Sequence, residues 1–164
     1  MALLIRAAEG EDLAAVLDVG HRTWPVTYGP IAGEDYVAMG LAKWWTEEAT
    51  IPAIRAGRVS VAEVDGAVVG IAAVGPHESQ LALWKLYVLP EHQGMAIGSA
   101  LLESVVARAT GDYSKIRLSY LDGNTSAEGF YRSKGFVETG RESGGDGIPD
   151  SVWMELVLDP REQA

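Results

Sequence analysis

The chain has 164 residues, of which 48% are hydrophobic and 22% charged, a size and composition typical of one globular domain. It contains no cysteine, which excludes disulfides, thiolate-bound metals and a cysteine nucleophile, and no apolar run is long enough to cross a bilayer. Its first residues, MALLIRAAEGED, are too short and too soon acidic for a signal peptide. We therefore expect one cytoplasmic domain over residues 1–164.

The acidic charge is unevenly distributed. The net charge of −10 comes from 23 acidic and 13 basic residues. Residues 81–136 carry 6 basic and 5 acidic side chains, whereas residues 1–80 carry 5 and 11, and residues 137–164 carry 2 and 7. No nucleic-acid partner is expected, because binding phosphates takes clustered Lys and Arg. The acidic segments would attract a cationic ligand, although the same charge could serve solubility alone.

Hydrophobic periodicity predicts the N-terminal elements. A strand over Leu3–Ala7 is followed by a helix that begins near Gly10. One or two short helices are expected in residues 23–57, where prolines and glycines interrupt the chain. The same segment holds the aromatic residues Trp24, Tyr28, Tyr36, Trp44 and Trp45. Residues 59–74 form two β-branched runs joined at Asp65 and Gly66, which is a strong hairpin signal.

The C-terminal half continues with strands over residues 81–88 and Lys115–Leu121 on either side of a helix over Ile97–Ala109. Thr125 and Glu128 have the spacing of a capping box, and the helix that they open should end at Gly135, with Phe136 folding back onto it. The last strands are expected over residues 136–139 and 151–158, joined by a glycine-rich loop over residues 140–150. The order of elements predicts a single α/β domain.

A short loop at residues 93–99 joins a strand to the N-terminus of a helix. Such a junction can bind an anion, because several unpaired backbone N–H groups point outward together. The loop lacks the Gly-Lys-Ser/Thr of a Walker sequence and the G-x-G-x-x-G of a dinucleotide-binding fold. The alternative is a strand-to-helix turn in which the glycines serve only a steric purpose.

Two patterns together resemble the GNAT superfamily of acyl-CoA-dependent N-acyltransferases. The loop residues Gln93, Ala96 and Gly98 match the family form [Q/R]-x-x-G-x-[G/A]. The second pattern, N-x-x-A-x-x-F-Y-x-x-x-G-F, is formed by Asn124, Ala127, Phe130, Tyr131, Gly135 and Phe136. The resemblance covers residues 59–136 most clearly. It implies a single mixed, mostly antiparallel sheet of about seven strands flanked by about four helices.

The resemblance also implies a binding site for acetyl-CoA as co-substrate. The strand that ends at Val88 should splay from its neighbour, so that backbone groups near Leu86 and Val88 pair with the pantetheine arm. Asn124 would contact the same arm, in addition to helping cap a helix. The pyrophosphate would be held by backbone amides in the first loop, whose residues are Gln93, Gly94, Met95, Ala96, Gly98 and Ser99.

Alanine at position 96 departs from the family pattern, in which this position is glycine. If the φ angle of Ala96 is negative the methyl group costs little. If φ is positive the loop is strained by about 1 kcal/mol or more. We expect binding of coenzyme A to be retained but weaker than with glycine.

Tyr131 is the catalytic residue that the resemblance implies, because the matching tyrosine faces the thioester sulfur and protonates the departing thiolate. A phenol with a pKa of about 10 is protonated at neutral pH, while the leaving thiol has a pKa near 8.5. The general base is not identified. Glu34, Asp35 and Glu78 are candidates by residue type alone, and the histidines do not cluster, so no metal is expected.

The acceptor site is expected among Trp24, Tyr28, Tyr36 and the loop over residues 140–150, whereas Trp44 and Trp45 fit the core or a homodimer interface better. The predicted reaction moves acetyl from acetyl-CoA to a primary amine by direct attack in a ternary complex. The amine could belong to a polyamine, an aminoglycoside, an amino acid or a peptide. The alternatives are a catalytically silent acyl-CoA-binding or regulatory module on the same fold, and a structural dimer subunit with a vestigial pocket.

Overall fold

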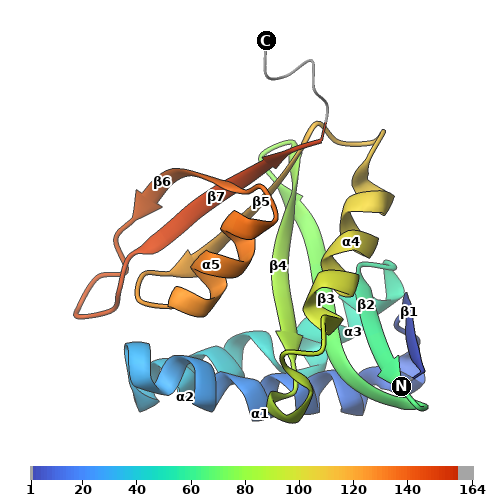
Figure 1. Ribbon diagram of the computed structural model, residues 1–164. Coiled ribbons are helices and arrows are strands. Elements are labelled where there is room, and N and C mark those ends of the chain that lie inside the picture. Colours follow the sequence, from blue (N-terminus) through green and yellow to red (C-terminus); the bar gives the residue numbers. More distant parts are fainter. Residues whose placement is uncertain (1, 159–164) are drawn as a thin grey trace.

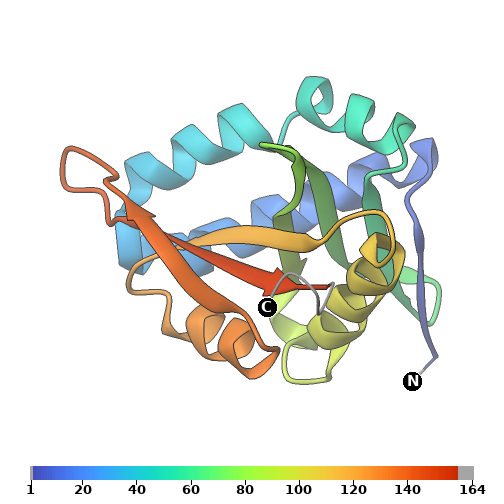
Figure 2. The ribbon, with the colours of Figure 1, turned by 90° about the horizontal axis from the view of Figure 1, so that it is seen from above.

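A computed structural model describes residues 2–158 and shows a seven-stranded sheet with helices on both faces (Figure 1). Viewed from above, the sheet separates α1, α2 and α3 on one side from α4 and α5 on the other (Figure 2). The strands are β1 (Leu3–Ala7), β2 (Val59–Val64), β3 (Ala67–His77), β4 (Gln80–Val88), β5 (Lys115–Leu121), β6 (Val137–Glu142) and β7 (Ser151–Val157). The α-helices are α1 (Leu13–Ala32), α2 (Glu34–Trp44), α3 (Glu47–Arg55), α4 (Ile97–Ala109) and α5 (Thr125–Ser133).

The strand order is β1-β2-β3-β4-β5-β7-β6, and every neighbouring pair is antiparallel except β4 and β5. The predicted mixed, mostly antiparallel sheet is therefore confirmed, with five α-helices where about four were expected. The hairpin between β2 and β3 turns at Asp65 and Gly66, whose φ angles of 51° and 87° are those of a type I′ turn. Buried side chains of the central strands, including Ile71, Ile116 and Met154, form the core.

Helix α1 is longer than predicted. It runs through Pro25 and Pro30 to Ala32, where the sequence suggested separate short helices. A proline costs a helix one backbone hydrogen bond. Packing compensates, because Trp24 is 5% exposed and stacks on Tyr36 of α2 with ring centroids 5.7 Å apart. Tertiary contacts thus override the local breakers.

Of the two capping residues expected at the start of α5, Asn124 is the N-cap, and Thr125 is already helical. The Asn124 side chain accepts a hydrogen bond from the Ala127 N–H at 3.2 Å, so the capping box of Thr125 and Glu128 is not formed. The end of α5 is as predicted. Gly135 has a φ of 96°, and the buried Phe136 donates its N–H to the Tyr131 carbonyl at 3.1 Å.

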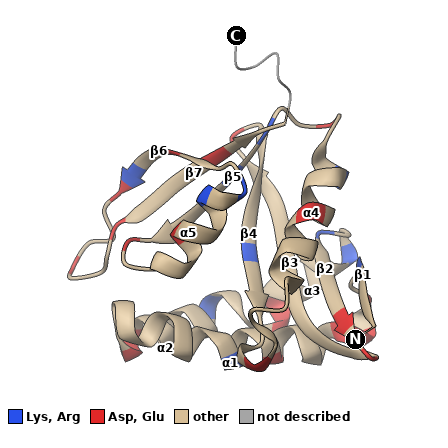
Figure 3. Ribbon diagram, in the orientation of Figure 1, with Lys and Arg blue, Asp and Glu red and all other residues tan. Residues whose placement is uncertain are grey.

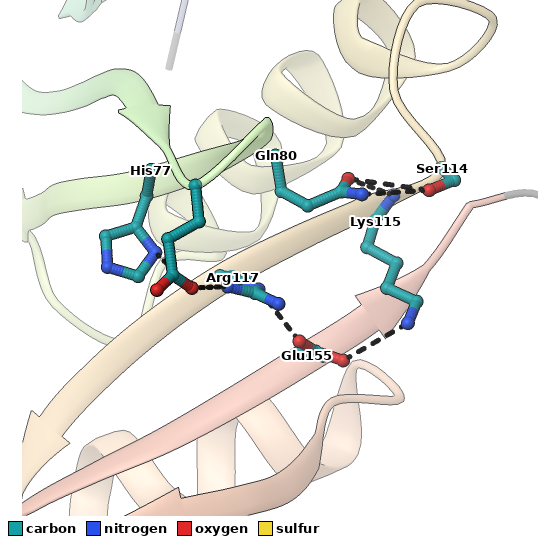
Figure 4. A network of polar contacts seen from close by, with 7 residues as sticks. His77, Gln80, Ser114, Lys115, Arg117 and Glu155 are labelled. Carbon is teal, nitrogen blue, oxygen red and sulfur yellow. Dashed lines mark hydrogen bonds and ion pairs between the residues drawn. The ribbon is translucent and has the colours of Figure 1, made fainter. Parts of the chain in front are cut away.

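Strands β4 and β5 pair only at Leu81 with Ile116 and at Ala82 with Arg117, and they separate beyond Ala82. A polar network holds them together at the closed end (Figure 4). Arg117 on β5 donates to Glu155 on β7 at 2.8 Å and to Glu78 in the turn before β4 at 2.5 Å. The network ties β4, β5 and β7 together where the opening between the strands begins.

Candidate active site

A cavity of about 650 Å³ lies where β4 and β5 separate. It is bordered by α1, the second half of β4, the loop before α4, the end of β5 and the first turns of α5. Seven of the site residues predicted from the sequence border it, namely Leu86, Val88, Gln93, Gly94, Gly98, Asn124 and Tyr131. Met95, Ala96 and Ser99 lie in the same loop and helix start, although they are not among the described residues that line the cavity.

The loop before α4 contains two residues in a left-handed conformation and a run of backbone N–H groups without acceptors. Gly94 and Ala96 have φ angles of 82° and 63°, so both adopt the left-handed conformation, and Ala96 is the N-cap of α4. Within residues 2–158, the N–H groups of residues 94–99 find no acceptor. A helix N-terminus with free donors attracts a phosphate through hydrogen bonds and the helix dipole.

Two side chains hold this loop and α5 in place. The Gln93 side-chain amide donates to the Val88 carbonyl at 2.9 Å, which ties the loop to the end of β4. The Asn124 side chain caps α5, as its helix-capping interpretation predicted. A contact between Asn124 and the pantetheine arm stays a prediction.

Tyr131 is positioned by α5 and borders the cavity. Its ring packs edge-on against Phe130 and Phe136, with centroids 5.3 and 5.5 Å away. The hydroxyl makes no hydrogen bond within residues 2–158, so it is available to a ligand. Burial raises the pKa of Tyr131, with a further contribution from nearby Tyr28, and this keeps the hydroxyl protonated throughout the neutral range.

Lys85 and Tyr87 on β4 also border the cavity, and the sequence interpretation did not assign either of them to the site. Tyr87 shares a hydrogen bond of 2.8 Å between hydroxyl groups with Tyr28 of α1. The Lys85 ammonium donates to the Trp44 carbonyl at 2.6 Å and lies 4.0 Å from the centre of the Trp45 ring. Burial lowers the pKa of Lys85 to about 8. Lys85 and Tyr87 are two positions apart on one strand, so their side chains point to the same face of the sheet. This alternation is the sequence signal that could have placed both residues at the site.

Most of the predicted acceptor site is not at the cavity. Tyr28 borders it, but Trp24 is packed in the core, and neither Tyr36 nor the loop over residues 140–150 reaches it within the described chain. Trp24 does not line the cavity, because its position on the continuous helix α1 packs it against α2. The predicted core position of Trp45 is confirmed by its 2% exposure.

The candidate bases chosen by residue type lie elsewhere. Glu34 and Asp35 are exposed at the start of α2, and Glu78 pairs with Arg117. None of the three borders the cavity. Over residues 2–158, no group of three or more His, Asp or Glu side chains gathers in the way that a metal site needs. No helix in that range has the length and hydropathy required to span a bilayer.

A family model described as the acetyltransferase (GNAT) domain matches residues 55–138, which contain the loop, the opening between β4 and β5 and all of α5. The chain belongs to the GNAT acetyltransferases. This confirms the resemblance and the predicted class of enzyme, an acetyltransferase.

Individual relatives of this GNAT acetyltransferase agree with that membership. Human N-acetyltransferase 8B is 38% identical over 105 residues, which cover 59% of this chain and 43% of that protein, so the match spans less than half of the human relative. Spermidine N(1)-acetyltransferase of Thermoplasma acidophilum is 24% identical over 143 residues, covering 83% and 89% of the two chains. The PaiA N-acetyltransferase of the same organism, solved in complex with coenzyme A, has a TM-score of 0.82 at 24% identity, covering 96% and 99% of the two chains.

Proposed function

We propose that this enzyme transfers an acetyl group from acetyl-CoA to a primary amine by direct attack in a ternary complex, with Tyr131 as the proton donor. The observation that supports this most strongly is one shared cavity. This cavity is bordered by the part of β4 that lacks a β5 partner, by the start of the N–H-rich loop before α4, and by Tyr131. A homodimeric state and a cytoplasmic location stay predictions from the sequence.

The residues present fit acetyl-CoA. The N–H groups of residues 94–99 would hold the pyrophosphate, because they lack protein acceptors and stand at the positive end of α4. Beyond Ala82, β4 has no pairing partner on the edge that faces β5, so its backbone can pair with the amide-bearing pantetheine arm in the manner of an added strand.

Acetyl-CoA supplies an activated thioester, in which the amine nitrogen forms a bond to the acetyl carbon while the bond from carbon to sulfur breaks. Tyr131 would donate a hydrogen bond to the leaving sulfur and pass its proton to it. The raised pKa of Tyr131 ensures that this proton is present at neutral pH. Since no Asp or Glu among the described residues borders the cavity, the amine would release its own proton to water, and the Tyr131 phenolate would regain a proton from water to complete the cycle.

Thiol release from acetyl-CoA, measured with a panel of polyamines, aminoglycosides, amino acids and peptides, tests the activity. Calorimetry measures coenzyme A binding in parallel. We expect both binding and amine-dependent thiol release. Binding without thiol release for any amine would show a silent acyl-CoA-binding module, and absence of binding would overturn the assignment of the cavity.

A substitution at Ser99 tests the phosphate cradle separately. Ser99→Asp places a negative charge in the first turn of α4, where it favours the helix but repels a pyrophosphate. We expect the melting temperature to be kept or raised while coenzyme A affinity falls at least about tenfold. Ser104→Asp, in the middle of the same helix, is the matched control and should leave the affinity unchanged. Equal affinity of the two variants would place the pyrophosphate elsewhere.

A further inference from the structure

The cavity has a charge opposite to that of the whole chain. The protein carries 23 acidic and 13 basic residues, yet among the described residues that border the cavity there is no Asp or Glu. Lys85 is the one Lys or Arg side chain in that set. β4 shows a basic position in Figure 3, and in the sequence of β4 this is Lys85. The acidic surplus therefore lies outside the place where an acceptor must bind.

The Lys85 ammonium is not neutralised by the protein. One of its three donors goes to the Trp44 carbonyl at 2.6 Å, and the ring of Trp45 lies below it at 4.0 Å. No carboxylate of residues 2–158 comes within 4 Å of it to form an ion pair. A partly desolvated ammonium with free donors is a binding site for an anion, because a charge-assisted hydrogen bond replaces the water that burial removes.

An aromatic side chain, Trp84, borders the same cavity as Lys85. Trp84, its neighbour in the sequence, is 47% exposed and lies at a bulge where β3 and β4 shift register. His77 stacks on Trp153 with ring centroids 4.8 Å apart, and Trp84 meets both rings edge-on. His77 and Trp153 are not among the described residues that line the cavity, but their contacts hold Trp84 in place. The Trp84 ring can therefore cover a hydrocarbon or ring while Lys85 holds a charged group.

We propose that the acceptor is a primary amine that also carries a carboxylate, of the α-amino acid type with an apolar side chain, and that Lys85 binds this carboxylate. The inference rests on the proposed acetyl transfer. A polyamine fits the cavity poorly, because its second ammonium would face Lys85 without any carboxylate to pair with. The acidic segments can still attract cations to the surface, but they do not reach the cavity.

The test compares N-acetyl-phenylalanine with N-acetyl-phenylalaninamide, which differ in the carboxylate alone, by calorimetry on protein saturated with coenzyme A. The corresponding leucine pair and spermidine are measured alongside. For the unmodified protein we expect the acids to bind at least about tenfold more tightly than the amides, and more tightly than spermidine. Lys85→Arg should keep the preference for acids, and Lys85→Met should lose it. Lys43→Met is the matched control, since Lys43 is an exposed lysine over the Trp44 ring and does not line the cavity.

Kinetics with phenylalanine and its amide give a second readout. Lys85→Met should raise KM for the acid more than it lowers kcat, whereas loss of a catalytic base would lower kcat. Amides that bind as well as acids, a preference that survives in Lys85→Met, or tighter binding of spermidine would each overturn the inference. Product binding needs no turnover. If the acids bind more tightly than the amides but no thiol is released, the proposed acetyl transfer is refuted and this inference is not. If thiol is released with spermidine and not with phenylalanine, this inference is refuted and the acetyl transfer is not.

Discussion

Replacement of Ala96 by glycine should stabilise the protein. Ala96 has a φ of 63° and a ψ of 16°, a left-handed conformation that costs a residue with a Cβ about 1–2 kcal/mol. The residue is exposed, so removal of its methyl group loses little packing. Glycine adds about 0.4–1 kcal/mol of conformational entropy to the unfolded chain. The difference spans about 0–1.6 kcal/mol with a midpoint of about 0.8 kcal/mol, which corresponds to an increase in Tm of about 2–3 °C for a chain of this length.

The assay is thermal unfolding of Ala96→Gly beside Ala107→Gly, which changes an exposed alanine in the interior of the same helix. The control should lose about 1 kcal/mol, because glycine there has no strain to relieve. Calorimetry should show that Ala96→Gly binds coenzyme A at least as tightly as the unmodified protein. A loss of stability equal to that of the control, or a large loss of coenzyme A affinity, would refute the reasoning about the loop.

Three further predictions follow from particular contacts. Asn124→Ala should cost about 1 kcal/mol in chemical unfolding through loss of the α5 cap, whereas Asn124→Asp should keep the cap. Gly40→Ala should cost about 1–3 kcal/mol, because a Cβ there lies 2.0 Å from the Trp24 ring, while Gly129→Ala meets nothing within 4 Å and should not destabilise. Burial lowers the pKa of Lys85 from 10.5 to about 8, so between these values the unfolded chain binds more protons. Denaturant titrations should therefore show the unmodified protein gaining about 1–3 kcal/mol over Lys85→Met as pH rises from about 8 to about 10, and parallel curves would contradict this.

Local signals in the sequence located most of the elements that form the site. The two residues Asp65 and Gly66 suffice to predict the hairpin turn, and Gly135 with Phe136 predicts the end of α5. Both features need a left-handed backbone conformation that few residues adopt, so the sequence marks them clearly. The sequence left two capping residues for α5, since Asn124 and Thr125 are both good capping residues and local pattern does not separate them; the structure uses Asn124.

Features that depend on distant contacts could not be predicted in this way. The continuation of α1 past Pro25 depends on Trp24 packing against α2, and α2 has no fixed place until the chain folds. Lys85 was recognised only as a residue in the middle of a strand, because the Trp44 carbonyl that binds it lies 41 residues earlier. The charge of the cavity likewise emerges only when five separate elements come together.

The most direct test of the account measures kcat and acetyl-CoA affinity for Tyr131→Phe, with Tyr120→Phe as a control that also borders the cavity. The hydroxyl of Tyr131 makes no hydrogen bond within residues 2–158, so its removal should leave folding and affinity nearly unchanged. We predict that kcat falls at least about a hundredfold in Tyr131→Phe, as expected for loss of a general acid, and changes little in the control. Unchanged turnover of Tyr131→Phe would contradict the assignment of this tyrosine as the proton donor.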